Sequence, residues 1–162
     1  MRPTLLFLAA LAAFSSLVGR GQSLEKPPPA RLLLACGDSL MQMPATRALP
    51  RAFETLTPPV RVISAVSIGT GLARPDRYDW PRRLRETLER EGTPAAAVLW
   101  FGANDDQPLR TPEGKTFSPD SPEWIEEYTA RARHLLSLLK NAGTSHILWV
   151  GLPRMRDAPL QR

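Results

Sequence analysis

A serine that follows a buried strand is the first residue in this chain with the setting for chemistry. Residues 32–36 are apolar or small, which is typical of a strand covered on both faces. Gly37-Asp38-Ser39 then leads into a helix-compatible segment, and Asp38 and Ser39 are both residue types that cap helix N-termini. We therefore expect Ser39 at the carboxyl end of a strand and the start of a helix, where N–H groups favour a negatively charged oxygen. This setting suits a nucleophile, although an ordinary strand-to-helix turn has the same pattern.

Donors for an oxyanion are expected from three separate loops. The Ser39 N–H is the first, and a backbone N–H of the Gly69-Thr70-Gly71 loop is the second. The side-chain amide of Asn104, which follows another apolar strand after Gly102, is the third. A serine nucleophile needs such donors, a base, and a group that orients the base.

The elements that position these loops alternate between strand and helix patterns. Because strands that alternate with helices form parallel sheets, the sequence predicts an α/β fold with helices on both faces of the sheet and with functional loops at the carboxyl ends of its strands. The predicted strands cover residues 31–36, 60–66, 95–101 and 146–150, and the predicted helices cover 40–56, 79–91 and 121–141, with a polar loop over 102–119.

The composition argues against a nucleic-acid-binding protein and against a disulfide-stabilised one. The 162 residues are 43% hydrophobic and carry a formal charge of +5. The arginines of residues 82–90 alternate with glutamates, which indicates a solvated helix face rather than a nucleic-acid surface. Cys36 is the single cysteine, so no intramolecular disulfide forms.

No cofactor or metal is expected. The Gly69-x-Gly71 pattern has Arg74 where a dinucleotide motif needs its third glycine, and no helix opens there. The four carboxylates that follow strands lack companion His or Cys residues at ligand spacing, so we expect them to cap and brace loops. They are Asp38, Asp76, Asp105 and Asp106.

The N-terminal residues predict export. Residues 1–23 combine a positive start, a short apolar run and small residues, which is the pattern of a secretory signal peptide. Residues 24–30 contain three consecutive prolines and are expected to form a linker, and residues 31–162 form the domain. We therefore expect a secreted or periplasmic protein that has no stable membrane span after signal cleavage. The alternative is that the apolar segment is retained as an anchor.

An ordered set of motifs resembles the SGNH (GDSL-type) hydrolase superfamily, and more narrowly its DUF459 branch of exported bacterial proteins. The set comprises residues 37–42, 70–76, 79–81, 102–105, 121–124 and 149–156. This resemblance implies a three-layer α/β/α, flavodoxin-like fold. It implies Ser39 as the nucleophile, with oxyanion donors at Ser39, Gly71 and Asn104. Gly69 is the alternative to Gly71.

The chain departs from that family where the base should be. The family takes its base and orienting acid from a C-terminal Asp-x-x-His block, and this sequence has none. Its two histidines, His134 and His146, are expected on a helix and at the start of a strand, out of reach of Ser39. The chain therefore resembles a truncated SGNH hydrolase that lacks the last strand and helix of the fold.

The expected function is a serine esterase acting on ester bonds such as carbohydrate O-acetyl esters, impaired or inactive without its base. Arg74, Trp80 and Trp124 are the expected substrate-binding residues. The alternative is a non-catalytic periplasmic binding or assembly factor for cell-envelope polysaccharide. Neither reading involves nucleic acid, and the sequence indicates no oligomeric state.

Overall fold

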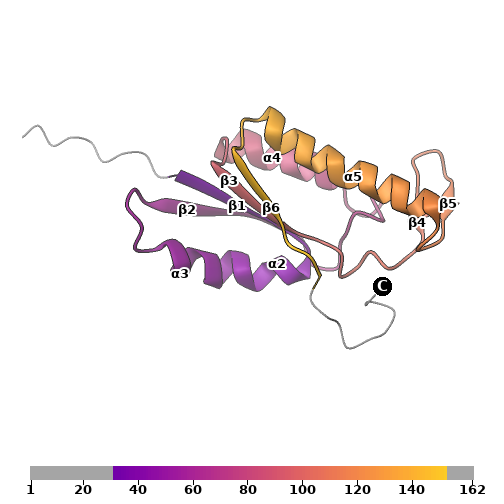
Figure 1. The fold of residues 1–162 in the computed structure, drawn as a ribbon, viewed down its shortest axis with the longest axis horizontal. Helices are drawn as coiled ribbons and strands as arrows, with labels where there is room; N and C mark the ends of the chain where they lie inside the picture. The colour runs from indigo at the N-terminus through magenta and orange to yellow at the C-terminus, as the bar shows by residue number, and fades with distance from the viewer. Residues whose placement is uncertain (1–30, 153–162) are drawn as a thin grey trace, which may run out of the picture.

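A parallel sheet is the centre of the computed structural model, which describes residues 31–152 (Figure 1). Within these residues its strands are β1 (Arg31–Gly37), β2 (Val60–Val66), β3 (Ala96–Trp100) and β6 (His146–Trp149), in the order β2-β1-β3-β6. Every neighbouring pair is parallel. This order, with the second strand outside the first, is that of a flavodoxin-like sheet. The strand predictions are confirmed, and the proposed signal peptide and linker (1–23 and 24–30) lie outside the described residues.

Helices cover both faces of the sheet, which confirms the three-layer prediction (Figure 1). One layer is a continuous helical run of α2 (Ser39–Met43), the π-helical segment η1 (Pro44–Ala48) and α3 (Leu49–Phe53). The opposite layer contains α4 (Trp80–Glu91) and α5 (Pro122–Asn141).

The π-helical segment explains how the first helix accommodates two prolines. Proline lacks an N–H and its ring clashes with the carbonyl four residues back. Pro44 begins η1, and the Leu49 N–H bonds to the Pro44 carbonyl five residues back, which widens the turn. Pro50 is the second residue of α3, directly after this widened turn. The helix predicted over 40–56 therefore forms, but it ends at Phe53.

The two faces of the sheet have separate cores because side chains alternate along each strand. Towards α4 and α5 the core contains Leu34, Cys36, Ile63, Ala65, Leu99, Leu135 and Leu139. Towards α2 the buried residues are Ala35, Met41 and Ala45. Cys36 fills a small buried site as expected, and burial raises the pKa of its thiol to about 12.

A short hairpin interrupts the predicted polar loop over 102–119. Its strands β4 (Leu109–Arg110) and β5 (Thr116–Phe117) pair antiparallel. Strands of two residues are too short to produce an alternating pattern, so sequence reasoning missed them. None of the helices within residues 31–152 has the length and apolar character that crossing a membrane requires.

The core assignment predicts a large difference between two leucines of the sheet. Leu34 is fully buried, whereas Leu148 is 58% exposed. Leu34→Ala should lower the free energy of unfolding by about 2–5 kcal/mol, because it leaves a cavity. Leu148→Ala, the matched control, should change it by less than about 0.5 kcal/mol. Urea unfolding of both variants measures the difference, and equal losses would contradict this description of the core.

Candidate active site

The carboxylate of Asp38 joins the loops that follow β1 and β3. Its Oδ1 accepts the Leu40 N–H at 2.9 Å and so caps the helix that Ser39 begins. Its Oδ2 accepts the N–H groups of Gly102 and Ala103, both at 3.1 Å. The side chain is buried. Asp38 therefore both caps its helix and braces a neighbouring loop, as the sequence predicts.

The electrostatic setting of Asp38 combines opposing effects. Burial raises the pKa of its carboxyl, and the three backbone N–H groups lower it by less. The nearby charge of Asp105 adds to the increase. Desolvation therefore dominates, and the pKa lies above its ordinary value.

Asn104 connects the loops after β3 and β2. Its Nδ2 donates to the Thr70 carbonyl at 2.9 Å, and its own backbone carbonyl accepts from the side-chain amide of Gln107. An amide nitrogen carries two hydrogens, so the bond to Thr70 orients the group and leaves a second hydrogen as a donor. This contact brings the loop after β3 against the loop after β2.

Asp105 anchors the loop that carries Gly71. It accepts the Ala73 N–H and the Tyr128 hydroxyl, each at 2.8 Å. A Cβ on Gly71 would lie 2.1 Å from Asp105 Oδ1, so only glycine fits against this carboxylate. Burial and the charge of Asp105 raise the pKa of Tyr128 well above its ordinary value, so the hydroxyl keeps its proton and donates.

Arg131 of α5 also forms hydrogen bonds to this loop. Its Nη1 donates to the carbonyls of Leu72 at 2.7 Å and Ala73 at 3.2 Å, and its Nη2 donates to the Arg110 carbonyl at 2.8 Å. Its Nε pairs with Glu127 at 2.8 Å. Sequence reasoning missed Arg131, because a glutamate and an arginine four residues apart are typical of an ordinary exposed helix face. It also missed Tyr128.

The predicted nucleophile and its neighbours lie at one edge of the sheet. Ser39 is exposed at the N-terminus of α2, where the first helical N–H groups have no intrahelical acceptor. Of the two candidate glycines, Gly71 is buried and Gly69 is exposed with a φ of 70°. The contacts of Asp38 and Asn104 bring the three predicted loops together. The catalytic roles of these residues stay predictions.

The predicted substrate-binding residues differ in exposure. Arg74 is bound by Asp76 through bonds of 2.8 and 2.6 Å. Trp80 is almost fully buried, with its ring centroid 4.8 Å from that of Phe101. Trp124 is half-buried, and its ring stacks on Tyr128 at 4.7 Å. Only Trp124 therefore presents an appreciable aromatic surface.

The two histidines lie away from Ser39. His146 begins β6 and pairs with Ala96 at the start of β3, which is the amino end of the sheet, opposite the Ser39 edge. His134 is exposed in the middle of α5 and lines a pocket beside α4. The expected position of His146 is confirmed by the strand register, and His134 lies on the helix as expected.

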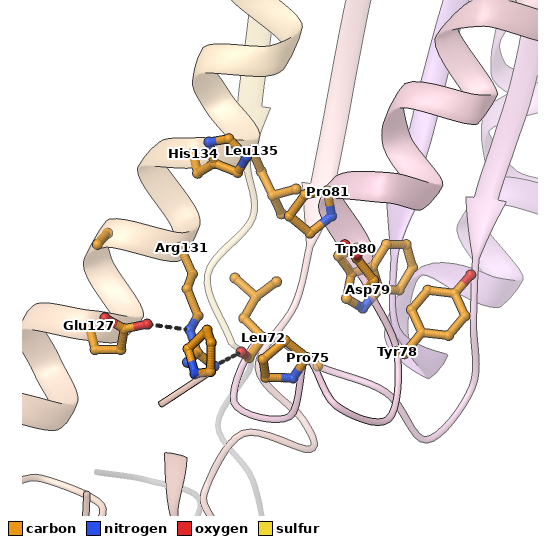
Figure 2. A pocket seen from close by; sticks show the side chains of 13 residues that line it. Leu72, Pro75, Tyr78, Asp79, Trp80, Pro81, Glu127, Arg131, His134 and Leu135 are labelled. Atoms are coloured by element: carbon orange, nitrogen blue, oxygen red, sulfur yellow. Dashed lines mark hydrogen bonds and ion pairs between the residues drawn. The ribbon is translucent and has the colours of Figure 1, made fainter. Parts of the chain in front are cut away.

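Two pockets lie beside the edge of the sheet that carries Asp38, Ser39 and Asn104, which we call the polar edge. Figure 2 shows the first, of about 330 Å³, between α4 and α5, where Leu72, Tyr78, Trp80, Arg131 and His134 line the wall. The second, of about 280 Å³, lies at the carboxyl ends of β3 and β6, and its walls include Gly102, Asp105, Trp124 and Leu152. Ser39 lines neither pocket. Residues 31–152 contain no group of three or more His, Cys, Asp or Glu side chains arranged to hold a metal ion.

The fold and this edge define the class: an α/β protein with a parallel sheet and polar loops gathered at the carboxyl ends of its strands. The chain belongs to the family described as protein of unknown function DUF459, whose model matches residues 32–162. No curated protein matches it at a significant level.

The packing of Gly71 gives a testable difference between two glycines. Gly71→Ala should lower the free energy of unfolding by about 1–3 kcal/mol, because its Cβ would overlap the Asp105 carboxylate. Gly151→Ala is the matched control, since no atom of residues 31–152 lies within 4 Å of its Cβ position. Chemical denaturation measures both, and a Gly71→Ala variant as stable as the control would refute the contact.

The Arg74–Asp76 pair gives a pH-dependent prediction. A hydrogen bond from Arg74 lowers the pKa of Asp76 to about 2, from its ordinary value of 3.8. Since the folded pKa is depressed, the contribution of the pair is present above pH 3.8 and is lost as the pH falls through about 2. Arg74→Ala should return the pKa of Asp76 towards 3.8, whereas Arg77→Ala should not change it. NMR titration of the carboxyl carbon measures this, and an unchanged pKa in Arg74→Ala would contradict the pairing.

Proposed function

We propose that this chain carries the nucleophile and oxyanion hole of an SGNH-type serine esterase. The observation that carries the proposal is the hydrogen bond from Asn104 Nδ2 to the Thr70 carbonyl, together with the clamp of Asp38 on Gly102 and Ala103. These contacts bring the loops after β1, β2 and β3 to the edge where Ser39 is exposed. The DUF459 match is compatible with the resemblance to this superfamily.

The proposed reaction begins with attack of Ser39 Oγ on the carbonyl carbon of an ester, while a base takes the hydroxyl proton. The N–H groups of Ser39 and Gly71 and the Asn104 amide stabilise the resulting oxyanion. The intermediate then collapses, the bond to the alcohol oxygen breaks, and the base returns the proton to that oxygen. Water hydrolyses the acyl-serine by the same sequence of steps.

The base is the part that this chain's own histidines do not supply. His146 lies at the opposite end of the sheet, and His134 faces a pocket that Ser39 does not line. In this proposal the base is a histidine from outside this chain. The chain by itself then retains the electrostatic part of catalysis and lacks proton transfer.

The proposed substrate class is an ester on a carbohydrate, such as an O-acetyl group, in a secreted or periplasmic setting. The stacked Trp124 and Tyr128 rings support it, because an aromatic surface packs well against the apolar face of a sugar. Trp124 Nε1 donates to the Gln107 carbonyl at 3.0 Å, which fixes the ring beside the loop that carries Asn104.

Because His146 lies at the opposite end of the sheet from Ser39, a function that needs no base is the second candidate. Without a base, the same edge can bind an ester or polysaccharide without turning it over. The alternative proposal is therefore a non-catalytic binding or assembly factor for cell-envelope polysaccharide, with Trp124 as a contact and Ser39 dispensable.

Acyl transfer to Ser39 distinguishes the two functions. With p-nitrophenyl acetate alone, the chain should hydrolyse no faster than its Ser39→Ala variant. When imidazole is added as a substitute base, Ser39 should become acetylated, and mass spectrometry of peptides locates the acetyl group. Asn104→Ala should slow that acetylation by about 10²–10³-fold, because it removes an oxyanion donor.

Two outcomes would overturn parts of the proposal. A clear Ser39-dependent rate without imidazole would show that a base is present in this chain. No acetylation of Ser39 above that of the exposed Ser64, at any imidazole concentration, would refute the esterase. Binding of acetylated polysaccharide equally by wild type and Ser39→Ala would then support the alternative.

A further inference from the structure

A group of arginines surrounds the N-terminal half of α4, apart from the Ser39 edge. A pocket of about 310 Å³ lies there, and its lining contains neither Ser39 nor Asn104. The lining consists of Arg77, Tyr78, Asp79, Arg82, Arg83 and Glu86. Three guanidinium groups thus face two carboxylates, which leaves positive charge in excess.

The two carboxylates are already engaged. Glu86 pairs with Arg82 at 2.8 Å, one helical turn away. Asp79 caps α4 by accepting the Arg82 N–H at 2.9 Å. Within residues 31–152, the side chains of Arg77 and Arg83 form no ion pair with any carboxylate. The excess charge is therefore that of Arg77 and Arg83.

Arg83 is the most unusual member of the group. Its Nε is buried and has no hydrogen-bond partner within the described residues. The residue as a whole is half-buried. Leaving a buried charged donor without an acceptor costs free energy, and an anion in the pocket would offset that cost.

Tyr78 offers a neutral donor beside these two arginines. Its ring lies between this pocket and the one drawn in Figure 2, where the hydroxyl is turned away from the other labelled side chains. A phenolic hydroxyl donates readily to a phosphate oxygen, and the planar guanidinium fork matches two oxygens of a phosphate group.

We propose that Arg77, Tyr78 and Arg83 form a binding site for a phosphate group, either free phosphate or a phosphate monoester. The site is independent of the proposed esterase function, because it shares no residue with the Ser39 edge. Arg83 is the principal ligand, since it lines the pocket, is half-buried and forms no ion pair within residues 31–152.

Two methionine substitutions on α4 test the site. Arg83→Met keeps a long apolar side chain and removes the charge. Arg85→Met is the matched control, because Arg85 is exposed on the same helix and does not line the pocket. Inorganic phosphate and glycerol 3-phosphate are titrated at constant ionic strength, with chloride as the comparison. The readouts are the thermal unfolding midpoint and the NMR signals of arginine Nε–H groups.

Wild type and Arg85→Met should unfold at a higher temperature with phosphate than with chloride, and the Nε–H signal of Arg83 should shift as phosphate binds. In Arg83→Met the Kd for phosphate should rise about tenfold or more. Without phosphate, Arg83→Met should be at least as stable as wild type, because it removes an unpaired half-buried charge. Tighter binding of glycerol 3-phosphate would identify a monoester as the ligand, and tighter binding of inorganic phosphate would identify the free ion.

Three results would overturn the site. One is no phosphate-specific stabilisation of wild type. Another is equal stabilisation of wild type and Arg83→Met. The third is a large loss of stability in phosphate-free Arg83→Met but not in Arg85→Met, which would show that Arg83 already has a partner in the folded protein.

Discussion

The buried carboxylate of Asp38 is the constraint on which the polar edge of this protein depends. Removing a carboxylate from water is costly, and here three backbone N–H groups from two loops compensate for part of that cost. Each of those part-buried N–H groups would in turn lose its acceptor in the fold if Asp38 were absent. The start of the helix at Ser39 and the path of the chain after β3 are therefore fixed by one side chain.

Asp105 extends the same arrangement to the third loop. It connects the Ala73 N–H to the Tyr128 hydroxyl, while Arg131 takes the carbonyls on either side of that N–H. Helix α5 thereby supports the loop that carries Gly71. The charge of Asp105 also helps to raise the pKa of Asp38, although different donors hold the two carboxylates.

In the proposed esterase, the groups at this edge separate two parts of serine catalysis. The expected oxyanion donors are held by contacts among part-buried groups, and such fixed donors are what electrostatic stabilisation requires. Proton transfer needs a base within hydrogen-bonding reach of the serine, and His146 is placed by the strand register at the other end of the sheet. The proposed phosphate site lies outside this edge, where Arg77 and Arg83 have no ion-pair partner among residues 31–152.

The sequence by itself determined the strands, the helices and the order in which they alternate, because apolar runs, capping residues and turn glycines act over a few neighbouring positions. It also identified Asp38 and Asp105 as loop-bracing residues. The π-helical turn at Pro44, the hairpin at 109–117 and the roles of Tyr128 and Arg131 were decided only by the tertiary structure. The roles of Tyr128 and Arg131 depend on contacts with residues far apart in the chain, and a glutamate–arginine pair on a helix has the same pattern whether it faces solvent or holds a loop. The hairpin strands are too short to give a pattern of their own.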